Sequence, residues 1–164
     1  MKRVDRCTRK NAGAEACPVC GQVGRRVTDA TIRAMLDPAH VERLLCVERR
    51  FCRTPSCDVL YYGPDGCSVC KQDARVRVGL KETEDPIPLC YCFGFNRADV
   101  EREHAEAGSC TIVEQIAAEI RAGRCACEVK NPSGACCLGD VRAAVAEVTA
   151  RPPRRRKRLT LDGG

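Results

Sequence analysis

The sequence has few of the large apolar residues that usually build a protein core. Only 4% of its 164 residues are aromatic, and it contains no tryptophan. No segment approaches the roughly 18 consecutive apolar residues that a membrane-spanning helix needs. The N-terminus also lacks an apolar run like the centre of a signal peptide. We therefore expect a cytoplasmic protein with no membrane contact, whose thin core needs additional stabilisation.

Cysteine is the residue present in excess. The chain has 15 cysteines, a level typical of scaffolds built on cysteine. In a reducing cytosol cysteines remain thiols or bind metals, and an odd count with C-x-C and C-x2-C pairs fits metal ligation. We predict metal sites rather than a disulfide framework. No Ser–His–Asp grouping indicates hydrolysis, so we name no catalytic residues.

The positive charge is concentrated at one end. The net charge is +6, and residues 151–164 contain six basic residues and one acidic residue, a net +5, which leaves +1 for the rest. Such a segment can contact the phosphates of nucleic acid. It has no interleaved aromatic residues, however, which favours a solvated tail.

The first cysteine motif is C-P-V-C-G at residues 17–21. In such a knuckle two thiolates converge on one metal ion, and the glycine permits a tight turn that directs backbone N–H groups at the sulfur atoms. Spacing alone slightly favours a second C-x2-C pair as its complement, as in zinc ribbons. The two pairs that could complete a site with Cys17 and Cys20 are Cys52 with Cys57, and Cys67 with Cys70.

Other patterns predict the secondary structure of this half. A short helix is expected over Thr28–Leu36, and residues 41–47 form a second short helix or the approach to a strand. A strand is expected over Val59–Tyr62. Residues 75–78 alternate like an exposed strand, and the proline-containing segment 81–89 is typical of a linker.

The second cysteine-rich segment runs from Cys90 to Cys137 and holds seven cysteines. Cys90 and Cys92 lie two residues apart, so on an extended segment they face one side and can reach one iron together. Asn96 and Gly108 are expected to cap a helix over residues 97–107. A capping box that begins at Thr111 predicts a second helix, closed by Gly123.

Three further features bring the flanking thiols together. Cys125 and Cys127 again share one face, and residues 131–134 turn the chain back. Adjacent Cys136 and Cys137 tend to diverge, so we expect one ligand from that pair, followed by a helix over residues 138–148. Four thiolates suit a [2Fe–2S] cluster, but they suit zinc as well. The residues alone therefore leave the two alternatives open.

The motifs CYCFGF (90–95) and CACEVKNPSGACCLGDV (125–141) resemble the N-terminal domain of CopZ-type copper chaperones. In this half that domain is itself similar to bacterioferritin-associated ferredoxins. The resemblance extends to the motif at 17–21, to FCRTPSCDVLY (51–61) and to VRVG (76–79), and spans about residues 15–148.

The resemblance implies one zinc ion in the first half and one [2Fe–2S] cluster in the second. It assigns zinc to Cys17, Cys20, Cys52 and Cys57. It assigns the cluster to Cys90, Cys92, Cys127 and Cys137, with Cys125 and Cys136 as substitutes. Cys110 is expected to be a structural thiol.

The sequence also departs from that family. A CopZ-type chaperone has a further C-terminal domain with a Met-x-Cys-x2-Cys loop for Cu(I), whereas this sequence ends in the basic segment 151–164. The resemblance therefore does not by itself imply that this protein delivers copper. The pair Cys67–Cys70 is unusual for the family; these residues are either spare thiols or a dithiol for a soft metal.

We therefore expect an α+β protein in which a small zinc-stapled α/β module precedes a helical [2Fe–2S]-binding helix–turn–helix module. Its function would be one-electron transfer linked to copper handling, with an electron-transfer partner or a copper chaperone or transporter. The alternatives are a redox- or iron-sensing module that contacts nucleic acid through its tail, and a protein that sequesters soft metals. The expected segments are an arm (1–15), the zinc module (16–80), a linker (81–89), the cluster module (90–150) and a basic disordered tail (151–164).

Overall fold

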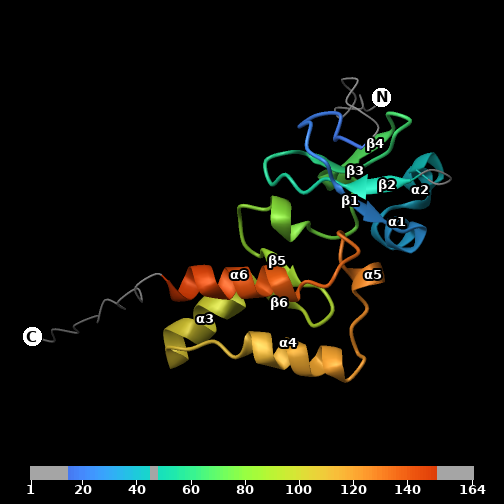
Figure 1. Ribbon diagram of the computed structural model, residues 1–164. Helices are drawn as coiled ribbons and strands as arrows, with labels where there is room; N and C mark the ends of the chain where they lie inside the picture. Colours follow the sequence, from blue (N-terminus) through green and yellow to red (C-terminus); the bar gives the residue numbers. More distant parts are fainter. Residues whose placement is uncertain (1–14, 45–47, 151–164) are drawn as a thin grey trace, which may run out of the picture.

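A computed structural model describes residues 15–44 and 48–150. A small sheet with two helices forms one end of the molecule, and a group of helices forms the other (Figure 1). The predicted α+β fold, with a sheet-containing half before a helical half, is confirmed. Cys7, Cys46 and the basic tail lie outside the described residues.

The first half is built on a four-stranded antiparallel sheet with strand order β1-β2-β3-β4. The sheet buries every residue of its two inner strands, so it forms the centre of this half. The first two helices lie between β1 and β2 in the chain. The elements are β1 (Arg25–Val27), α1 (Asp29–Met35), α2 (Pro38–Leu44), β2 (Arg49–Phe51), β3 (Val59–Tyr62) and β4 (Ser68–Cys70).

Helix α1 confirms the helix predicted near Thr28. The Thr28 side chain accepts a hydrogen bond from the Thr31 N–H and caps the helix, and the apolar face of α1 enters the core of the sheet half. The strand predicted over residues 75–78 is wrong. These residues form a bend followed by irregular chain, because the Arg75 N–H bonds to the Met35 carbonyl at the end of α1 and Val78 is buried.

In the second half, the described residues form a two-stranded hairpin and four helices. Three of these helices, α3, α4 and α6, pack around a core that includes Val100, Ile116 and Val141. The elements are β5 (Pro88–Cys90), β6 (Phe95–Asn96), α3 (Arg97–Ala107), α4 (Ile112–Arg121), α5 (Cys127–Lys130) and α6 (Leu138–Thr149). Among the described residues, no helix is long and apolar enough to cross a membrane.

Two helix-end predictions are confirmed and one is wrong. Asn96 caps α3 by accepting the Asp99 N–H at 3.1 Å, and Gly108 ends that helix in the left-handed conformation. The capping box at Thr111 does not form. The Thr111 hydroxyl donates to the Glu103 carboxylate at 2.6 Å instead, so a contact with the preceding helix replaces the local cap.

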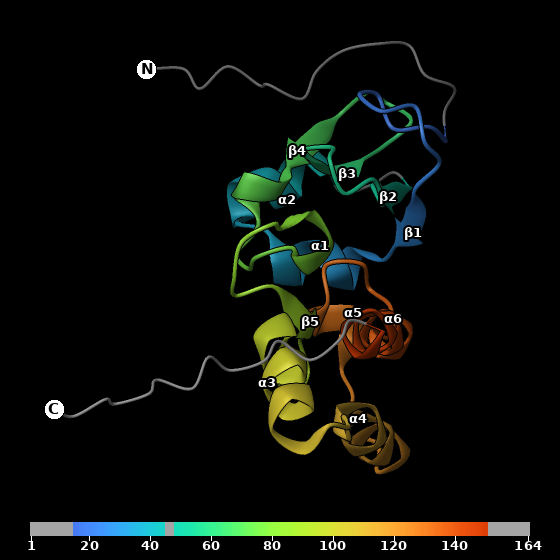
Figure 2. The same cartoon turned by 90° about the vertical axis from the view of Figure 1, so that its left-hand side faces the viewer.

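The two halves meet where α1 contacts α5 (Figure 2). The Thr28 hydroxyl donates to the Glu128 carboxylate at 2.8 Å, and the Thr31 hydroxyl donates to the Glu128 carbonyl at 2.7 Å. The buried Tyr61 hydroxyl donates to the Pro132 carbonyl at 2.6 Å. The segment that follows Cys127 is therefore held by the first half of the chain.

The connection between the halves contains two short 3-10 turns, Lys71–Asp73 and Gly79–Lys81. The Tyr91 hydroxyl accepts the Gly79 N–H at 2.8 Å and donates to the Arg77 carbonyl at 3.0 Å. Lys81, expected to begin a linker, is 3% exposed. The start of the expected linker is thus a packed part of the fold.

Candidate metal centres

Two loops at the end of the sheet form the first cysteine cluster. Cys17 and Cys20 lie in the turn before β1, and Cys52 and Cys57 flank the loop between β2 and β3. The Gly21 N–H bonds to the Cys17 carbonyl at 2.9 Å, and Gly21 has a φ of 74°, which is the tight turn predicted for the knuckle. Pairing of β1, β2 and β3 brings the two loops together.

The sulfur atoms of these four cysteines all lie within 4.8 Å of one another. Cys17 and Cys57 are 3.9 Å apart, and Cys20 and Cys52 are 3.6 Å apart. Tetrahedral zinc with Zn–S bonds of about 2.3 Å separates its sulfur ligands by about 3.8 Å. The donor set and its spacing therefore fit a zinc ion.

Backbone N–H groups favour the thiolate form at two sulfur atoms of this cluster. Backbone N–H groups of Val19 and Cys20 point at the Cys17 sulfur, and that of Thr54 points at the Cys52 sulfur. The pKa of Cys52 is lowered to about 4, chiefly because the Cys17 side chain donates to it, with further help from Thr54 and the Lys81 charge. The pKa of Cys17 is raised by the same contact and by burial.

The alternative second pair lies outside this group of sulfur atoms. Cys70 packs beside the cluster, and Cys67 packs against the core of the sheet half. Among the described residues, the sulfur atoms within 4.8 Å of one another here are those of Cys17, Cys20, Cys52 and Cys57.

The second cluster lies at the turn between β5 and β6 and at α5. The sulfur atoms of Cys92, Cys125 and Cys127 lie 3.9 Å (92–125), 3.5 Å (92–127) and 3.2 Å (125–127) apart. The Ala126 N–H donates to the Cys92 sulfur at 3.3 Å. The predicted convergence of Cys125 and Cys127 is thus present, and both sulfur atoms lie close to that of Cys92.

Cys90 and Cys137 form a separate pair beside this trio. Both are nearly inaccessible, with 1% and 2% exposure. Their side chains interact, which lowers the pKa of Cys90 to about 6 and raises the pKa of Cys137. The neighbouring Cys136 is exposed, so the two adjacent cysteines do diverge.

Cys90 and Cys92 do not lie on one extended segment, contrary to expectation. The chain turns after Cys90, and the Gly94 N–H bonds to the Cys90 carbonyl at 2.9 Å. Cys92 meets Cys125 and Cys127, whereas Cys90 meets Cys137. Cys110 makes a different contact, donating to the Glu103 carboxylate at 3.1 Å.

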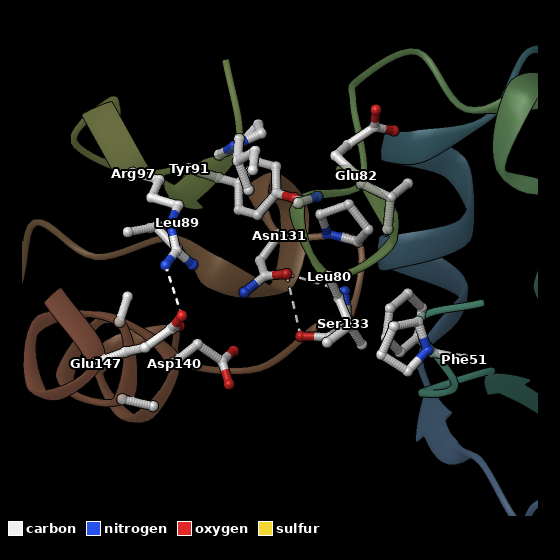
Figure 3. A pocket seen from close by; sticks show the side chains of 18 residues that line it. Phe51, Leu80, Glu82, Leu89, Tyr91, Arg97, Asn131, Ser133, Asp140 and Glu147 are labelled. Atoms are coloured by element: carbon white, nitrogen blue, oxygen red, sulfur yellow. Dashed lines mark hydrogen bonds and ion pairs between the residues drawn. The ribbon is translucent and has the colours of Figure 1, made fainter. Parts of the chain in front are cut away.

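A cavity of about 460 Å³ lies between parts of the two halves, near the second cluster (Figure 3). Tyr91, which lies between Cys90 and Cys92 in the chain, lines it together with Phe51 of the first half. Arg97 and Glu147 form a 2.8 Å ion pair on its other side. Sequence reasoning missed this cavity and the burial of Lys81, because both depend on contacts between segments far apart in the chain.

The fold and its two cysteine clusters define a cysteine-rich metal-binding protein with a zinc-binding domain. Residues 14–75 match the CopZ zinc binding domain family. The crystal structure of the Archaeoglobus fulgidus CopZ N-terminal domain superimposes with a TM-score of 0.66 at 30% identity, covering 78% of this chain and 95% of that domain. The chain belongs to the family of this CopZ N-terminal domain.

A curated relative extends beyond this domain. The copper chaperone CopZ of Archaeoglobus fulgidus is 36% identical over 126 residues, which is 74% of this chain. The chain spans 57% of the length of that relative. Family membership supports a role in metal handling.

Proposed function

We propose that this protein is a cytosolic zinc and [2Fe–2S] metalloprotein that transfers single electrons in the handling of copper. The observation that carries the proposal is the division of the second cluster into a buried pair and an adjacent trio of cysteines. A [2Fe–2S] cluster takes two thiolates on each of two irons. A single zinc ion would need four convergent sulfur atoms, as in the first cluster.

In this proposal Cys90 and Cys137 would bind one iron, and Cys92 and Cys127 would bind the other. Each sulfur lies in or beside the apolar core of the helical half. Backbone N–H groups point at three of them: Phe93 toward Cys90, Ala126 toward Cys92 and Cys137 toward Cys127. The bound cluster would supply one-electron chemistry, and such N–H groups tune its potential.

The first cluster has a structural role in this proposal. Four thiolates occupy every position around zinc, so no site remains for water or substrate. The zinc half instead positions the cluster segment, because α1 contacts α5 and the Tyr61 hydroxyl bonds to the Pro132 carbonyl. Zinc would stabilise the sheet half, which positions the second cluster, and the second cluster would carry the electron.

The partners in this proposal are inferred from the copper chaperone to which the chain is similar. The relative is a copper chaperone, so the reduced protein would give one electron to Cu(II), forming Cu(I) for a copper chaperone or transporter. A cellular one-electron donor would then reduce the oxidised protein again.

Anaerobic purification with metal analysis and a visible spectrum tests the proposal. We expect about two irons and one zinc per chain, and a coloured protein that bleaches on reduction. The dithionite-reduced protein, freed of excess reductant, should reduce about one Cu(II) per [2Fe–2S] cluster, measured with a Cu(I)-specific chelator. A colourless protein with zinc at both clusters would overturn electron transfer.

A further inference from the structure

Lys81 is a buried cation beside the zinc-binding loop. The residue is 3% exposed and lies in the 3-10 turn Gly79–Lys81. Its ammonium group donates to the carbonyls of Thr54 and Cys57, each at 2.8 Å. It also lies 5.9 Å from the centre of the Phe51 ring. The ammonium group is thus fixed on the loop that carries Cys52 and Cys57.

The surroundings of Lys81 differ from those of the other buried cations. Arg49 is paired with Asp65, and Arg50 is paired with Glu15 and Glu48. Among residues 15–44 and 48–150, no carboxylate forms an ion pair with Lys81. Carbonyl oxygens satisfy its hydrogen bonds but carry no full charge, and a buried charge without an opposite charge is costly. A nearby anion would therefore stabilise the buried ammonium group.

The zinc site supplies such an anion. Four thiolates and one Zn²⁺ carry a net charge of −2, and Lys81 bonds to the main chain of Cys57, one of the four cysteines. We propose that Lys81 is the charge partner of the zinc tetrathiolate and a positioning residue for the Cys52–Cys57 loop. The negative zinc site and the buried ammonium group stabilise each other.

This role also connects the zinc site with the second cluster. Two residues before Lys81, the Gly79 N–H bonds to the hydroxyl of Tyr91, which lies between Cys90 and Cys92. One short turn therefore contacts both cysteine-rich regions. The inference rests on the zinc part of the proposed function and is independent of the iron–sulfur part.

Zinc competition with a chromophoric chelator tests the role in the full-length, zinc-loaded protein. Lys81→Met keeps much of the apolar stem and removes the charge, and we expect zinc affinity to fall about 10- to 100-fold, as for other residues that support metal ligands. Lys81→Arg keeps the charge and should recover much of that loss. Lys71→Met is the matched control, because the Lys71 ammonium group donates to the Lys81 carbonyl at 2.9 Å and not to the loop; it should retain near-normal affinity.

A cobalt-substituted sample separates charge from geometry. If Lys81→Met keeps the tetrahedral Co(II)–thiolate spectrum while its affinity falls, the loss is electrostatic. If Lys81→Met does not fold, Lys81→Gln replaces it, because the amide retains N–H donors without the charge. Unchanged affinity in the folded charge-removing variant, or an equal loss in Lys71→Met, would overturn the role of Lys81. Failure of the electron-transfer proposal would appear instead as wild-type protein without iron.

Discussion

The two cysteine clusters differ in whether they contain more thiols than the proposed metal centre needs. The first brings together four sulfur atoms with the spacing of one tetrahedral ion. The second brings together five, divided into the pair Cys90–Cys137 and the trio of Cys92, Cys125 and Cys127. The comparison indicates that the first site depends on all four of its ligands, whereas the trio of the second site contains one thiol more than the cluster needs.

The largest effect is expected from removal of a ligand of the first cluster. Structural zinc in small domains binds with an apparent free energy of about 10–16 kcal/mol at neutral pH, comparable with the whole stability of a domain. Cys52→Ser should therefore lose zinc and unfold the sheet half. Zinc analysis and thermal unfolding by circular dichroism measure both losses.

Cys67→Ser is the matched control for this prediction. Cys67 is a free thiol in the same half, and its sulfur is not part of the four-cysteine set. This variant should keep its zinc and most of its stability. If Cys52→Ser also kept zinc and the wild-type melting temperature, a structural zinc site at these residues would be ruled out.

The second prediction tests the reserve thiol. Cys90→Ser removes one member of the buried pair. Among the described residues, no group of three or more sulfur atoms within 4.8 Å of one another includes Cys90 or Cys137, so iron content should fall by about tenfold or more. Cys127→Ser should keep a cluster with a shifted visible spectrum, because Cys125 lies 3.9 Å from Cys92 and can replace the lost ligand. Iron and sulfide analysis with visible spectra measures the difference.

Two further variants make this comparison decisive. The double variant Cys125→Ser/Cys127→Ser has no reserve and should lose its iron like Cys90→Ser. Cys110→Ser is the control, since the Cys110 thiol bonds to Glu103 and is not in the trio. Equal iron loss in Cys127→Ser and the double variant would show that Cys125 is no reserve.

The third prediction tests how far ordinary ion pairing stabilises the zinc half. Arg49 is buried and paired with Asp65, so Asp65→Asn leaves a charged group poorly paired and should cost about 2 kcal/mol of unfolding free energy. Arg49 also lowers the pKa of Asp65. The carboxylate's contribution is therefore present above its unfolded pKa of about 3.9 and lost as pH falls through the lower folded value.

Urea unfolding of wild type and Asp65→Asn at several pH values measures this contribution. The difference should be constant from about pH 7 to pH 5 and should close only below the ordinary carboxyl pKa. Both proteins retain the same cysteines, so loss of zinc at low pH affects them alike. A difference that closed well above pH 5 would point to another titrating group.

Local signals in the sequence predicted much of this structure. The C-P-x-C-G knuckle at Cys17 and the caps at Asn96 and Gly108 depend on a few neighbouring residues, and they form as expected. The failures depend on distant partners. Thr111 bonds to the preceding helix, and the 75–78 segment follows the end of α1.

The burial of Lys81 at the candidate site also depends on partners that are distant in the sequence. Its place in a charged, proline-containing stretch predicts exposure, yet its ammonium group bonds to carbonyls 24 and 27 residues away. The choice of Cys52 and Cys57 over Cys67 and Cys70 also came from a family resemblance and not from spacing. The strand order of the sheet, which spacing does not encode, brings the first pair to Cys17 and Cys20.

The smallest effect is expected where the two halves touch. Tyr61→Phe removes the hydroxyl that bonds to the Pro132 carbonyl at 2.6 Å, and it should cost about 1 kcal/mol of stability. Pro132 lies on the turn between Cys127 and Cys137, so the loss should also loosen the second cluster while the zinc site stays intact. We expect faster bleaching in air with unchanged zinc content.

Thr28→Val is the matched variant at the same junction. It removes the bond from the Thr28 hydroxyl to the Glu128 carboxylate, next to Cys127, together with the side-chain cap of α1, but leaves the buried Tyr61 contact in place. Because the Thr28–Glu128 bond is exposed, its removal should quicken bleaching less than Tyr61→Phe. If Tyr61→Phe loses stability but bleaches at the wild-type rate, the zinc half contributes to folding alone and does not support the second cluster.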